Sequence, residues 1–450
     1  MGEAFTNLLA FVVAISILVA VHEFGHYLVG RLAGMKVLRF SIGFGKPIWT
    51  WVRGEDRTEY CISAVPLGGY VRFLDSREGP VAPAERGRAF NHRPVPARIA
   101  VLLAGPGFNF LFAILAYWVL FMGGIPTLQP AVGDVVPGSY ADRAGLEFGD
   151  KIVAVDGVTT NDWETTLENI FDTVAAGGRV PLTLEDPDGR RRQATIVVGG
   201  DTVRLTEPDM LFDGLGFQPW QPPAVIGEVV KDGAAAAAGL EVGDRITSVD
   251  GEPIHSYSDL IRVVAPRAGK EVRIEYRRAG EARSVTTVLG SQEVDGETRG
   301  LLGVRGSSDL GSYYHVRKYG PLESVGAAAQ KTWASTVFTL RMLGRMATGH
   351  VSIKNISGPI NIAQYAGDSA QQGPTQFLIF LALVSISLGV LNLLPVPVLD
   401  GGQILYQGIE LVKGSPLSER SQAIGQQFGI LALILLMSFA FYNDIARILG

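Results

Sequence analysis

The sequence is poor in cysteine and in charge. Its 450 residues include one cysteine, Cys61, which excludes an intramolecular disulfide framework and a zinc site built from several cysteines. Lys, Arg, Asp and Glu make up 18% of the chain, below the roughly 25% of ordinary soluble domains. The net charge of -5 gives no basic footprint for nucleic acid, so we expect no nucleic-acid partner.

Charge is missing above all from four long hydrophobic runs. They cover Ala4 to Val21, Ile99 to Met122, Pro374 to Leu399 and Ser421 to Asn443. Each is long enough to cross a bilayer as a helix, so we predict a polytopic membrane protein in contact with lipid. The first run has no basic segment before it and no small-residue cleavage site after it, which favours a retained helix over a signal peptide.

The loop after the first run is basic. Between Tyr27 and Arg98 there are twelve Lys or Arg against six acidic residues. The positive-inside rule therefore places this loop, and the loop around Lys413, in the cytoplasm. Both termini and residues 127–373 are then expected outside, and the ends of the first and third runs lie on the cytoplasmic side.

A His-Glu-x-x-His motif follows the first run directly, at His22, Glu23 and His26. On a helix, residues four apart lie on one face, so the two histidines could bind one ion with the glutamate beside it. A three-residue pattern also arises by chance. Ionisable residues at membrane depth are costly, however, and indicate a functional site. A catalytic zinc ion normally has three protein ligands, so a third must come from elsewhere.

The third ligand predicted by the sequence is Asp400, on the same expected side of the membrane. It follows Asn392, Pro395 and Pro397, and the prolines should break the helix and turn the carboxylate back toward the two histidines. The alternative is an interfacial residue that ends a span. With Zn2+ held by His22, His26 and Asp400, Glu23 would act as general base in peptide hydrolysis. Asn392, Pro395 and Pro397 are also predicted to contact the substrate.

The predicted cytoplasmic loop has the composition of β-structure. Residues 37–52 and 58–74 are rich in β-branched and aromatic residues with Gly and Pro breaks, which predicts membrane-associated hairpins. A Pro-Leu-Gly-Gly sequence ending at Gly69 would form a turn. The strand edge near Gly68, Gly69 and Tyr70 could hold an extended substrate by strand addition.

The expected outside segment contains an internal repeat. Residues 135–157 align without a gap on residues 229–251, at an offset of 94 residues, the size of a small domain. Each copy predicts a strand, a short helix, a Gly-Asp turn and a strand that ends in Asp-Gly. The stretches from Ala144 to Asp150 and from Ala238 to Asp244 resemble PDZ domains, in the circularly permuted order of bacterial examples.

PDZ domains hold a peptide C-terminus in a loop whose backbone N–H groups bind the carboxylate. The resemblance assigns this loop to two tripeptides. They are Leu215, Gly216 and Phe217 in the first copy and Leu302, Gly303 and Val304 in the second. Peptide C-termini are therefore expected partners, although either domain could equally be a spacer without a ligand.

Residues 320–350 have the apolar spacing of an amphipathic helix, interrupted by Lys331, Arg341 and Arg345. These charges argue against a fifth span. Two interpretations remain, a helix on the outer membrane surface or a linker helix packed on a PDZ domain.

The motifs together resemble the site-2 protease family of intramembrane zinc metalloproteases. The resemblance is carried by residues 22–26, 104–109 and 392–401, and also by residues 40–45, 66–70 and 357–360. It implies a Gram-negative inner-membrane enzyme in a stress response, with the two PDZ domains in the periplasm as a filter for substrates. The implied substrate is a single-span anti-sigma factor already cut once in the periplasm, and remnant signal peptides are further candidates.

The expected fold class is an α-helical polytopic membrane protein with four transmembrane helices, a membrane-associated β-hairpin loop and two inserted α+β PDZ domains. The predicted segments are 1–34, 98–124, 374–402 and 421–443 for the helices, 35–97 for the loop, 127–220 and 221–309 for the PDZ domains, and 320–350 for the amphipathic helix. Two other functions compete with an intramembrane protease: a membrane-anchored PDZ adaptor without activity, and an enzyme that cuts soluble peptides at the membrane surface.

Overall fold

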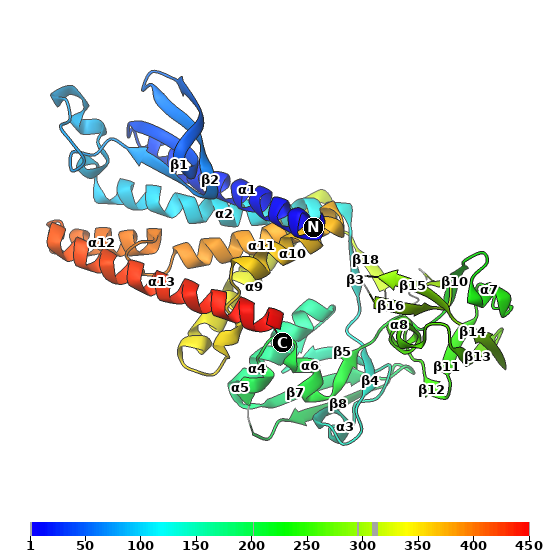
Figure 1. Cartoon of the computed structure of the whole chain (residues 1–450). Helices are drawn as coiled ribbons and strands as arrows, with labels where there is room; N and C mark the ends of the chain where they lie inside the picture. The colour runs from blue at the N-terminus through cyan, green and yellow to red at the C-terminus, as the bar shows by residue number, and fades with distance from the viewer. Residues whose placement is uncertain (1, 201, 295–296, 308–313, 450) are drawn as a thin grey trace. The chain divides into compact units, whose positions relative to one another are not determined.

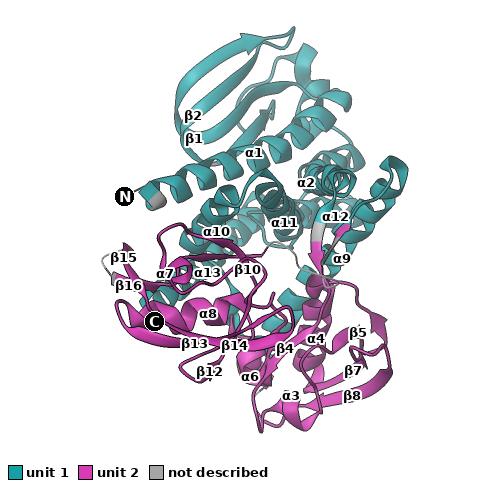
Figure 2. Cartoon of the chain, turned by 90° about the vertical axis from the view of Figure 1, so that its right-hand side faces the viewer, with its two compact units in different colours: residues 1–125, 317–450 teal, residues 126–316 magenta. Residues whose placement is uncertain are grey.

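The computed structural model describes residues 2–200, 202–294, 297–307 and 314–449. The chain divides into two compact units, coloured separately in Figure 2. Unit 1 combines the two ends of the chain, Met1–Ile125 and Arg317–Gly450, and unit 2 is the middle segment, Pro126–Val316.

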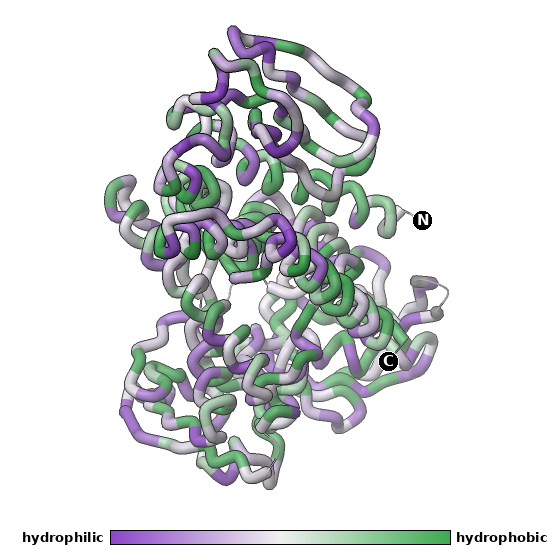
Figure 3. The backbone as a smooth tube through the Cα atoms, turned by 90° about the vertical axis from the view of Figure 1, so that its left-hand side faces the viewer, coloured by the Kyte–Doolittle hydropathy of each residue, from purple (hydrophilic) through white to green (hydrophobic). Residues whose placement is uncertain are grey.

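Four helices of unit 1 are long and apolar enough to cross a membrane, and no other helix among the described residues is. They are α1 (Gly2–Leu32), α2 (Val95–Gly123), α11 (Pro374–Asn392) and α13 (Glu419–Leu449). Figure 1 shows them running along a common direction, and Figure 3 shows hydrophobic residues along the helices next to both termini. The structure thus contains four candidate spans, as the sequence predicted.

The third hydrophobic run forms a shorter helix than predicted. Helix α11 ends at Asn392, before the predicted boundary at residue 402, and a separate helix, α12 (Asp400–Lys413), follows after a turn. Pro395 and Pro397 explain the break, because proline has no N–H for a helical hydrogen bond and disfavours helical geometry in the residue before it.

Helix α9 (Pro321–Ala347) occupies the region predicted to be amphipathic, and it is not a candidate span. It packs against α2 and α11. Ala328 of α9 is fully buried in a cluster with Ala116 of α2 and Ile386 of α11. The short η5 (Ile353–Asn355) and α10 (Pro359–Gln371) follow, and α10 packs against α1 and α13. The sequence did not predict α10 or α12.

The loop between α1 and α2 forms a small sheet from two long strands, β1 (Val37–Arg53) and β2 (Thr58–Phe73). Residues 39–42 of β1 lie between two parts of β2, pairing with residues 69–72 on one side and 59–62 on the other. The sheet therefore has more strand pairings than the simple hairpins that the sequence predicted. Two short 3-10 helices, η1 (Pro83–Arg88) and η2 (Phe90–His92), lead into α2.

Strand β2 reverses its direction between Ile62 and Gly69. Residues 59–62 of β2 pair with residues 39–42 of β1 so that the residue numbers of both strands rise together. Residues 69–72 of β2 pair with the same part of β1 in the opposite sense. The reversal falls at the Pro-Leu-Gly-Gly sequence predicted as a turn. Strand β1 bends at Gly43 and Gly45, whose φ angles of 91° and 85° favour glycine.

Unit 2 contains two copies of one topology. Two four-stranded sheets have the orders β6-β5-β7-β8 and β12-β11-β13-β14, and each copy adds a two-stranded sheet, β4-β9 or β10-β17. The elements of the first copy are β4 (Val132–Val135), α3 (Tyr140–Arg143), β5 (Lys151–Val155), β6 (Val158–Thr159), α4 (Trp163–Gly177), β7 (Arg179–Glu185), β8 (Arg191–Val197), α5 (Thr202–Leu205), α6 (Met210–Leu215) and β9 (Phe217–Pro219).

The second copy repeats this order with one extra hairpin. Its elements are β10 (Ile226–Val229), α7 (Ala234–Ala237), β11 (Arg245–Val249), β12 (Glu252–Pro253), α8 (Tyr257–Val264), η3 (Ala265–Arg267), β13 (Glu271–Arg278), β14 (Glu281–Val288), the hairpin β15 (Gly290–Val294) and β16 (Glu297–Leu301), and β17 (Val304–Gly306). Strands β3 (Ile125–Leu128) and β18 (Tyr314–Arg317) pair where the chain enters and leaves unit 2.

The predicted Asp-Gly turns and the separate cores support the repeat. Asp156 and Asp250 both have a φ of 50°, a left-handed conformation that aspartate tolerates in tight turns. Each copy has its own hydrophobic cluster, which includes Ile152 and Phe217 in the first copy and Ile246 in the second. The internal repeat read from the sequence is thus present as two separately packed cores.

Candidate metal centre

The two histidines continue a buried stripe along α1. Leu18 and Ala14 lie one and two turns before His22 on the helix, and both are buried in a cluster that includes Leu381 of α11. His22 and His26 occupy the next two turns of the same face, because positions four apart on a helix are neighbours. The helix face that packs against the other spans therefore carries both imidazoles into the interior of unit 1.

Two glycines bring α1 and α2 close together at the histidines. A Cβ atom at Gly25 would lie 2.3 Å from the carbonyl oxygen of Ala104. A Cβ atom at Gly105 would lie 2.3 Å from Nε2 of His26 and 2.8 Å from Cε1 of His22. Since Cβ atoms do not make such contacts, both positions need glycine for the imidazoles to lie against α2.

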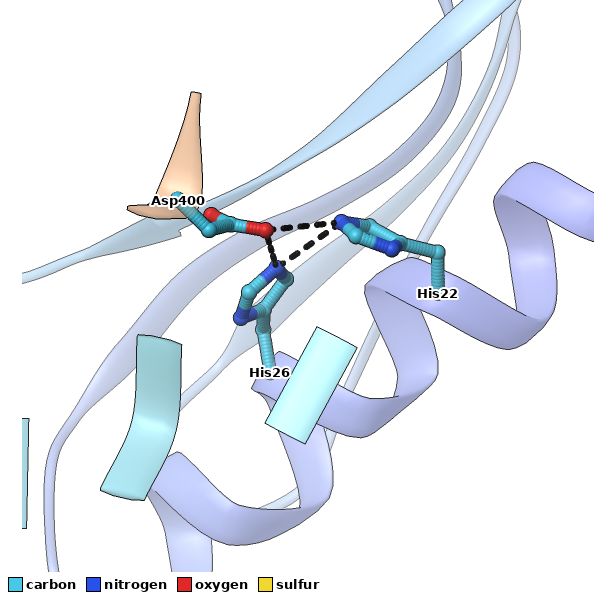
Figure 4. A group of neighbouring side chains, drawn as sticks. All are labelled: His22, His26 and Asp400. Carbon is cyan, nitrogen blue, oxygen red and sulfur yellow. Dashed lines mark hydrogen bonds and ion pairs between the residues drawn. The ribbon is translucent and has the colours of Figure 1, made fainter. Parts of the chain in front are cut away.

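The structure brings His22, His26 and Asp400 together, as Figure 4 shows. Nε2 of His22 and Nε2 of His26 are 3.1 Å apart. Oδ2 of Asp400 is 3.2 Å from the first nitrogen and 3.4 Å from the second. Three donor atoms from α1 and the start of α12 therefore converge on one point.

Their spacing and chemistry fit zinc. Ligands arranged tetrahedrally at the usual zinc–nitrogen distance of about 2.0–2.1 Å lie about 3.3 Å from one another. The three separations of 3.1, 3.2 and 3.4 Å match that value. Two imidazoles and one carboxylate are also a donor set typical of catalytic zinc, which leaves a fourth position open.

Two glycines after Asp400 fix the turn that carries it. A Cβ atom at Gly401 would lie 2.2 Å from the carbonyl oxygen of Leu393, and one at Gly402 would lie 2.1 Å from that of Val396. The start of α12 is therefore folded tightly onto the segment that follows α11. Because this segment has no room for side chains at the two glycines, it sets where the Asp400 carboxylate lies.

Both histidines have a second partner on α2. Nδ1 of His26 lies 2.8 Å from the carbonyl oxygen of Val101. A carbonyl only accepts hydrogen bonds, so this nitrogen carries the proton and Nε2 keeps its lone pair for a metal. Nδ1 of His22 lies 3.2 Å from the side-chain amide of Asn109. The sequence motif at residues 104–109 contains Asn109, whereas a backbone carbonyl leaves no mark in a sequence.

A cavity of about 670 Å³ opens beside the three donors. Its lining includes Glu23 and Asn392, together with Gly69 and Tyr70 at the edge of the sheet. Val71, the next residue of β2, lines the same cavity. The glutamate of the motif thus lies between the donor cluster and the edge strand of β2.

The glycine at the sheet edge lets the strand reach α1. A Cβ atom at Gly69 would lie 2.7 Å from Val19 and 3.0 Å from Cγ of Glu23. Gly68 lies against the ring of Phe44 and is not part of the cavity lining among the described residues. The sheet therefore approaches the candidate centre through Gly69 and Tyr70.

The two prolines do not line the cavity either. Pro397 packs toward Gly425 and Gly429 of α13, and its carbonyl oxygen accepts a hydrogen bond of 3.0 Å from Gln403. Pro395 is exposed. The structure therefore gives both prolines a place in the turn before Asp400, and Asn392 alone of this predicted group lies at the cavity.

The two tripeptides proposed as PDZ loops have core side chains. Leu215 and Phe217 are fully buried, and Leu302 is nearly so. Only backbone N–H groups could therefore meet a carboxylate. In the first copy the N–H of Gly216 already donates to the carbonyl oxygen of Phe212. Gly303 makes no such bond through its N–H within the described ranges, so the second loop is the more open of the two.

A second cluster of metal-binding residue types lies in unit 2, at Asp134, His255 and Asp259. Asp259 completes the capping box at the start of α8, where its carboxylate accepts hydrogen bonds from the backbone N–H and the hydroxyl of the N-cap residue Ser256. His255 pairs with Asp134 and is half exposed. Because the Asp259 carboxylate is already used as a helix cap, this cluster is an ion pair beside a capping box.

Comparisons with known proteins identify the family of this chain. The family model "Peptidase family M50" matches residues 10–436. The chain is 41% identical over 448 residues to the regulator of sigma E protease of Salmonella typhi and 39% identical over 448 residues to the regulator of sigma-E protease RseP of Escherichia coli (strain K12), covering 98% of this chain and 99% of each relative. Protease RseP of Yersinia pestis is 40% identical over 461 residues, with 98% and 99% coverage. The chain belongs to peptidase family M50, the site-2 protease family of zinc metalloproteases.

Proposed function

We propose that this protein cuts peptide bonds of single-span membrane proteins at a zinc centre held by His22, His26 and Asp400. The convergence of these three donors beside Glu23, in a unit built from four candidate spans, is the observation that supports it. When bound, zinc lowers the pKa of a water ligand toward neutrality and polarises the scissile carbonyl.

Glu23 is the proposed general base and acid. It stands next to His22 on α1 and lines the same cavity as the three donors, so its carboxylate is placed to take a proton from water and return it to the leaving amine. Asn392 lines the cavity from the end of α11 and is proposed to hold the substrate backbone or the developing oxyanion.

The edge of β2 is the proposed binding surface for the substrate strand. A transmembrane helix hides its carbonyl groups in backbone hydrogen bonds, so it must unwind before hydrolysis. Residues 69–72 pair with β1 on one side only, and Gly69 and Tyr70 lie at the cavity. An unwound substrate segment would add as a further strand there, with its scissile bond next to Glu23.

The substrate that the relatives suggest is an anti-sigma factor. Relatives aligned over nearly their whole length carry the name regulator of sigma-E protease. By analogy, this chain would release a cytoplasmic fragment of a single-span anti-sigma factor after a first periplasmic cut, in a Gram-negative inner membrane. Remnant signal peptides are a second proposed substrate class.

The two copies in unit 2 are the proposed PDZ domains. They would lie outside the membrane and filter substrates before these enter the active site. The repeated topology and the Gly-Asp turns at residues 149–150 and 243–244 support this assignment. We assign peptide binding to the second copy, since the N–H of Gly216 in the first is already bonded. Peptides with a free C-terminal carboxylate should bind the full chain, and the same peptides with a C-terminal amide should not.

Proteoliposomes that contain the full chain and a single-span substrate test the proteolytic function. Glu23→Gln should abolish cleavage and retain zinc, whereas His22→Ala should lose both. Glu55→Gln, at an exposed carboxylate between β1 and β2, is the matched control and should cleave like the parent. Equal cleavage by the parent and Glu23→Gln would contradict the mechanism, and no cleavage by either would favour a PDZ adaptor. Rapid cleavage of a soluble peptide without a span would favour the surface enzyme.

The membrane sidedness is tested with thiol labelling. Cys61 is the only cysteine, so a Cys61→Ser background allows single cysteines to be placed at exposed positions such as Glu55 and Asp188. A membrane-impermeant maleimide added to intact spheroplasts should label the position in unit 2 and spare the one in the loop. The opposite pattern would reverse the proposed topology.

A further inference from the structure

The motif at residues 104–109 of α2 has no role in the chemistry proposed so far. Gly105 makes room for the two imidazoles, and Asn109 lies four residues later on the same helix face. Asn109 is fully buried, with no exposed surface. Burying an amide costs free energy unless its hydrogen bonds are made, so a buried asparagine needs a partner.

The only hydrogen bond of this side chain among the described residues is to a candidate metal ligand. The amide group lies 3.2 Å from Nδ1 of His22, and the other amide atom, Oδ1, is buried without a partner. The amide oxygen and nitrogen are assigned by their surroundings, since the two orientations have the same shape. Turning the amide over would place the unsatisfied oxygen at His22.

The neighbouring histidine shows which orientation a metal requires. His26 gives Nδ1–H to the carbonyl oxygen of Val101, and its Nε2 is left with a lone pair at the donor cluster. His22 also directs Nε2 to that cluster. For this nitrogen to bind a metal, Nδ1 must carry the proton and needs an acceptor. Among the described residues, the side chain that lies within hydrogen-bonding distance of Nδ1 is that of Asn109.

We infer that Asn109 is a positioning residue for the zinc ligand His22. Its amide oxygen accepts Nδ1–H of His22, which fixes the tautomer and the ring orientation that present Nε2 to the metal. The backbone of Asn109 is itself held in place, because the buried hydroxyl of Ser385 on α11 donates to its carbonyl oxygen over 2.9 Å. The inference rests on the proposed zinc site.

The two histidines are then supported differently. The acceptor of His26 is a backbone carbonyl and is insensitive to substitution, whereas the acceptor of His22 is a side chain. Replacing Asn109 should therefore affect one ligand and leave the other oriented. Loss of a hydrogen-bonding partner behind a metal ligand typically weakens metal binding by about 10- to 100-fold.

The test measures zinc affinity of the purified full chain in detergent by competition with a chromophoric chelator. Asn109→Leu, which has similar volume and no acceptor, should bind zinc about 10- to 100-fold more weakly than the parent. Asn109→Asp keeps an acceptor and should recover most of that affinity. Ser324→Ala removes a buried hydroxyl of α9 that donates to the carbonyl oxygen of Gly320, and it should bind zinc like the parent.

Cobalt substitution supplies a second readout. The absorption bands of bound cobalt should shift in Asn109→Leu and keep the parental pattern in Ser324→Ala. Melting temperatures of all variants separate loss of an acceptor from loss of packing. If Asn109→Leu does not fold, Asn109→Ala takes its place.

Parental zinc affinity in a folded Asn109→Leu or Asn109→Ala variant would overturn the inference, as would equal losses in the variant without an acceptor and in Asn109→Asp. The proposed function is judged by a different variant, His22→Ala. If His22→Ala binds zinc as the parent does, the metal site itself is misassigned. If His22→Ala loses zinc and Asn109→Leu does not, only the role of Asn109 fails.

Discussion

Arg98 and Glu410 form a bidentate ion pair between α2 and α12. The two guanidinium nitrogens of Arg98 lie 3.1 and 2.7 Å from the two carboxylate oxygens of Glu410. Only 7% of the Arg98 side chain and 18% of the Glu410 side chain are exposed. Since α12 begins at Asp400, this pair holds the helix that supplies the third proposed ligand.

Removing one partner of this pair should destabilise the protein and loosen the metal site. Glu410→Ala leaves a buried guanidinium unpaired, at a cost of about 3 kcal/mol. We expect a lower melting temperature and weaker zinc binding, with Arg98→Leu/Glu410→Leu less affected than Glu410→Ala. Glu78→Ala, in the exposed pair with Arg72, is the control and should have little effect. A double variant no better than the single one would contradict the role of the ion pair.

Gly105→Ala should displace both histidines. The added methyl group would lie 2.3 Å from Nε2 of His26, so that ring must move out of the donor cluster. We expect zinc content and proteolysis to fall together, measured by elemental analysis and substrate cleavage. Gly107→Ala is a close control, because a Cβ atom there would meet nothing within 4 Å. Full zinc occupancy in Gly105→Ala would show that α1 and α2 can separate without harm.

Asp444 caps a helix that is distant in sequence. Its two carboxylate oxygens accept backbone N–H groups of Gly358, Ile360 and Asn361 at the start of α10, over 2.8, 2.9 and 3.1 Å. Asp444→Ala should therefore lower the free energy of unfolding by at least about 1–2 kcal/mol, as the loss of a helix cap typically does. Hydrogen exchange of the first turn of α10 should accelerate in this variant. Asp368→Ala, at an exposed carboxylate near the end of α10, should leave that turn protected.

Equivalent aspartates of the two copies should respond oppositely to pH. Burial raises the pKa of Asp244, but hydrogen bonds from Arg278 and from the backbone N–H of Glu241 outweigh it and leave the pKa below its usual range. Burial raises the pKa of Asp150, and the N–H of Glu147 and the charge of Arg192 do not offset that. The two positions are 94 residues apart, as the repeat requires.

The lowered pKa of Asp244 and the raised pKa of Asp150 change the stability of the fold with pH in opposite directions. Ionised Asp244 stabilises the fold at neutral pH, and that contribution is lost as pH falls through its folded-state pKa. The fold disfavours ionised Asp150, so its cost at neutral pH is relieved as pH falls. Melting temperatures should be compared between pH 3 and 7. Asp244→Asn should melt below the parent at neutral pH, and this difference should shrink as the pH falls. The melting temperature of Asp150→Asn relative to the parent should instead decrease as the pH falls. Parallel slopes for the two variants would contradict this assignment.

The sequence predicted the features that depend on local pattern. Hydrophobic runs gave the four candidate spans, the Asp-Gly pairs gave the turns of the repeat, and the proline pair gave the break before Asp400. Spacing of four residues placed His22 and His26 on one face. The membrane side expected for Asp400 then singled it out as their partner, and the structure brings the three together.

The remaining features depend on contacts between distant residues. Arg98 and Glu410 are 312 residues apart, and Asp444 caps a helix 86 residues away from it, so no local pattern indicates either contact. Val101 acts through its backbone carbonyl, which every residue has. Leu215 and Phe217 match a loop pattern in the sequence, and the burial of both side chains in the core depends on contacts that the pattern does not show.

The donors of the candidate centre come from opposite ends of the polypeptide, α1 and the start of α12. A ribosome therefore completes α1, the sheet and the whole of unit 2 before it adds Asp400. Throughout that time the chain has the two histidines of the centre but not its third donor. The three donors of the candidate centre therefore cannot meet until α12 is being made.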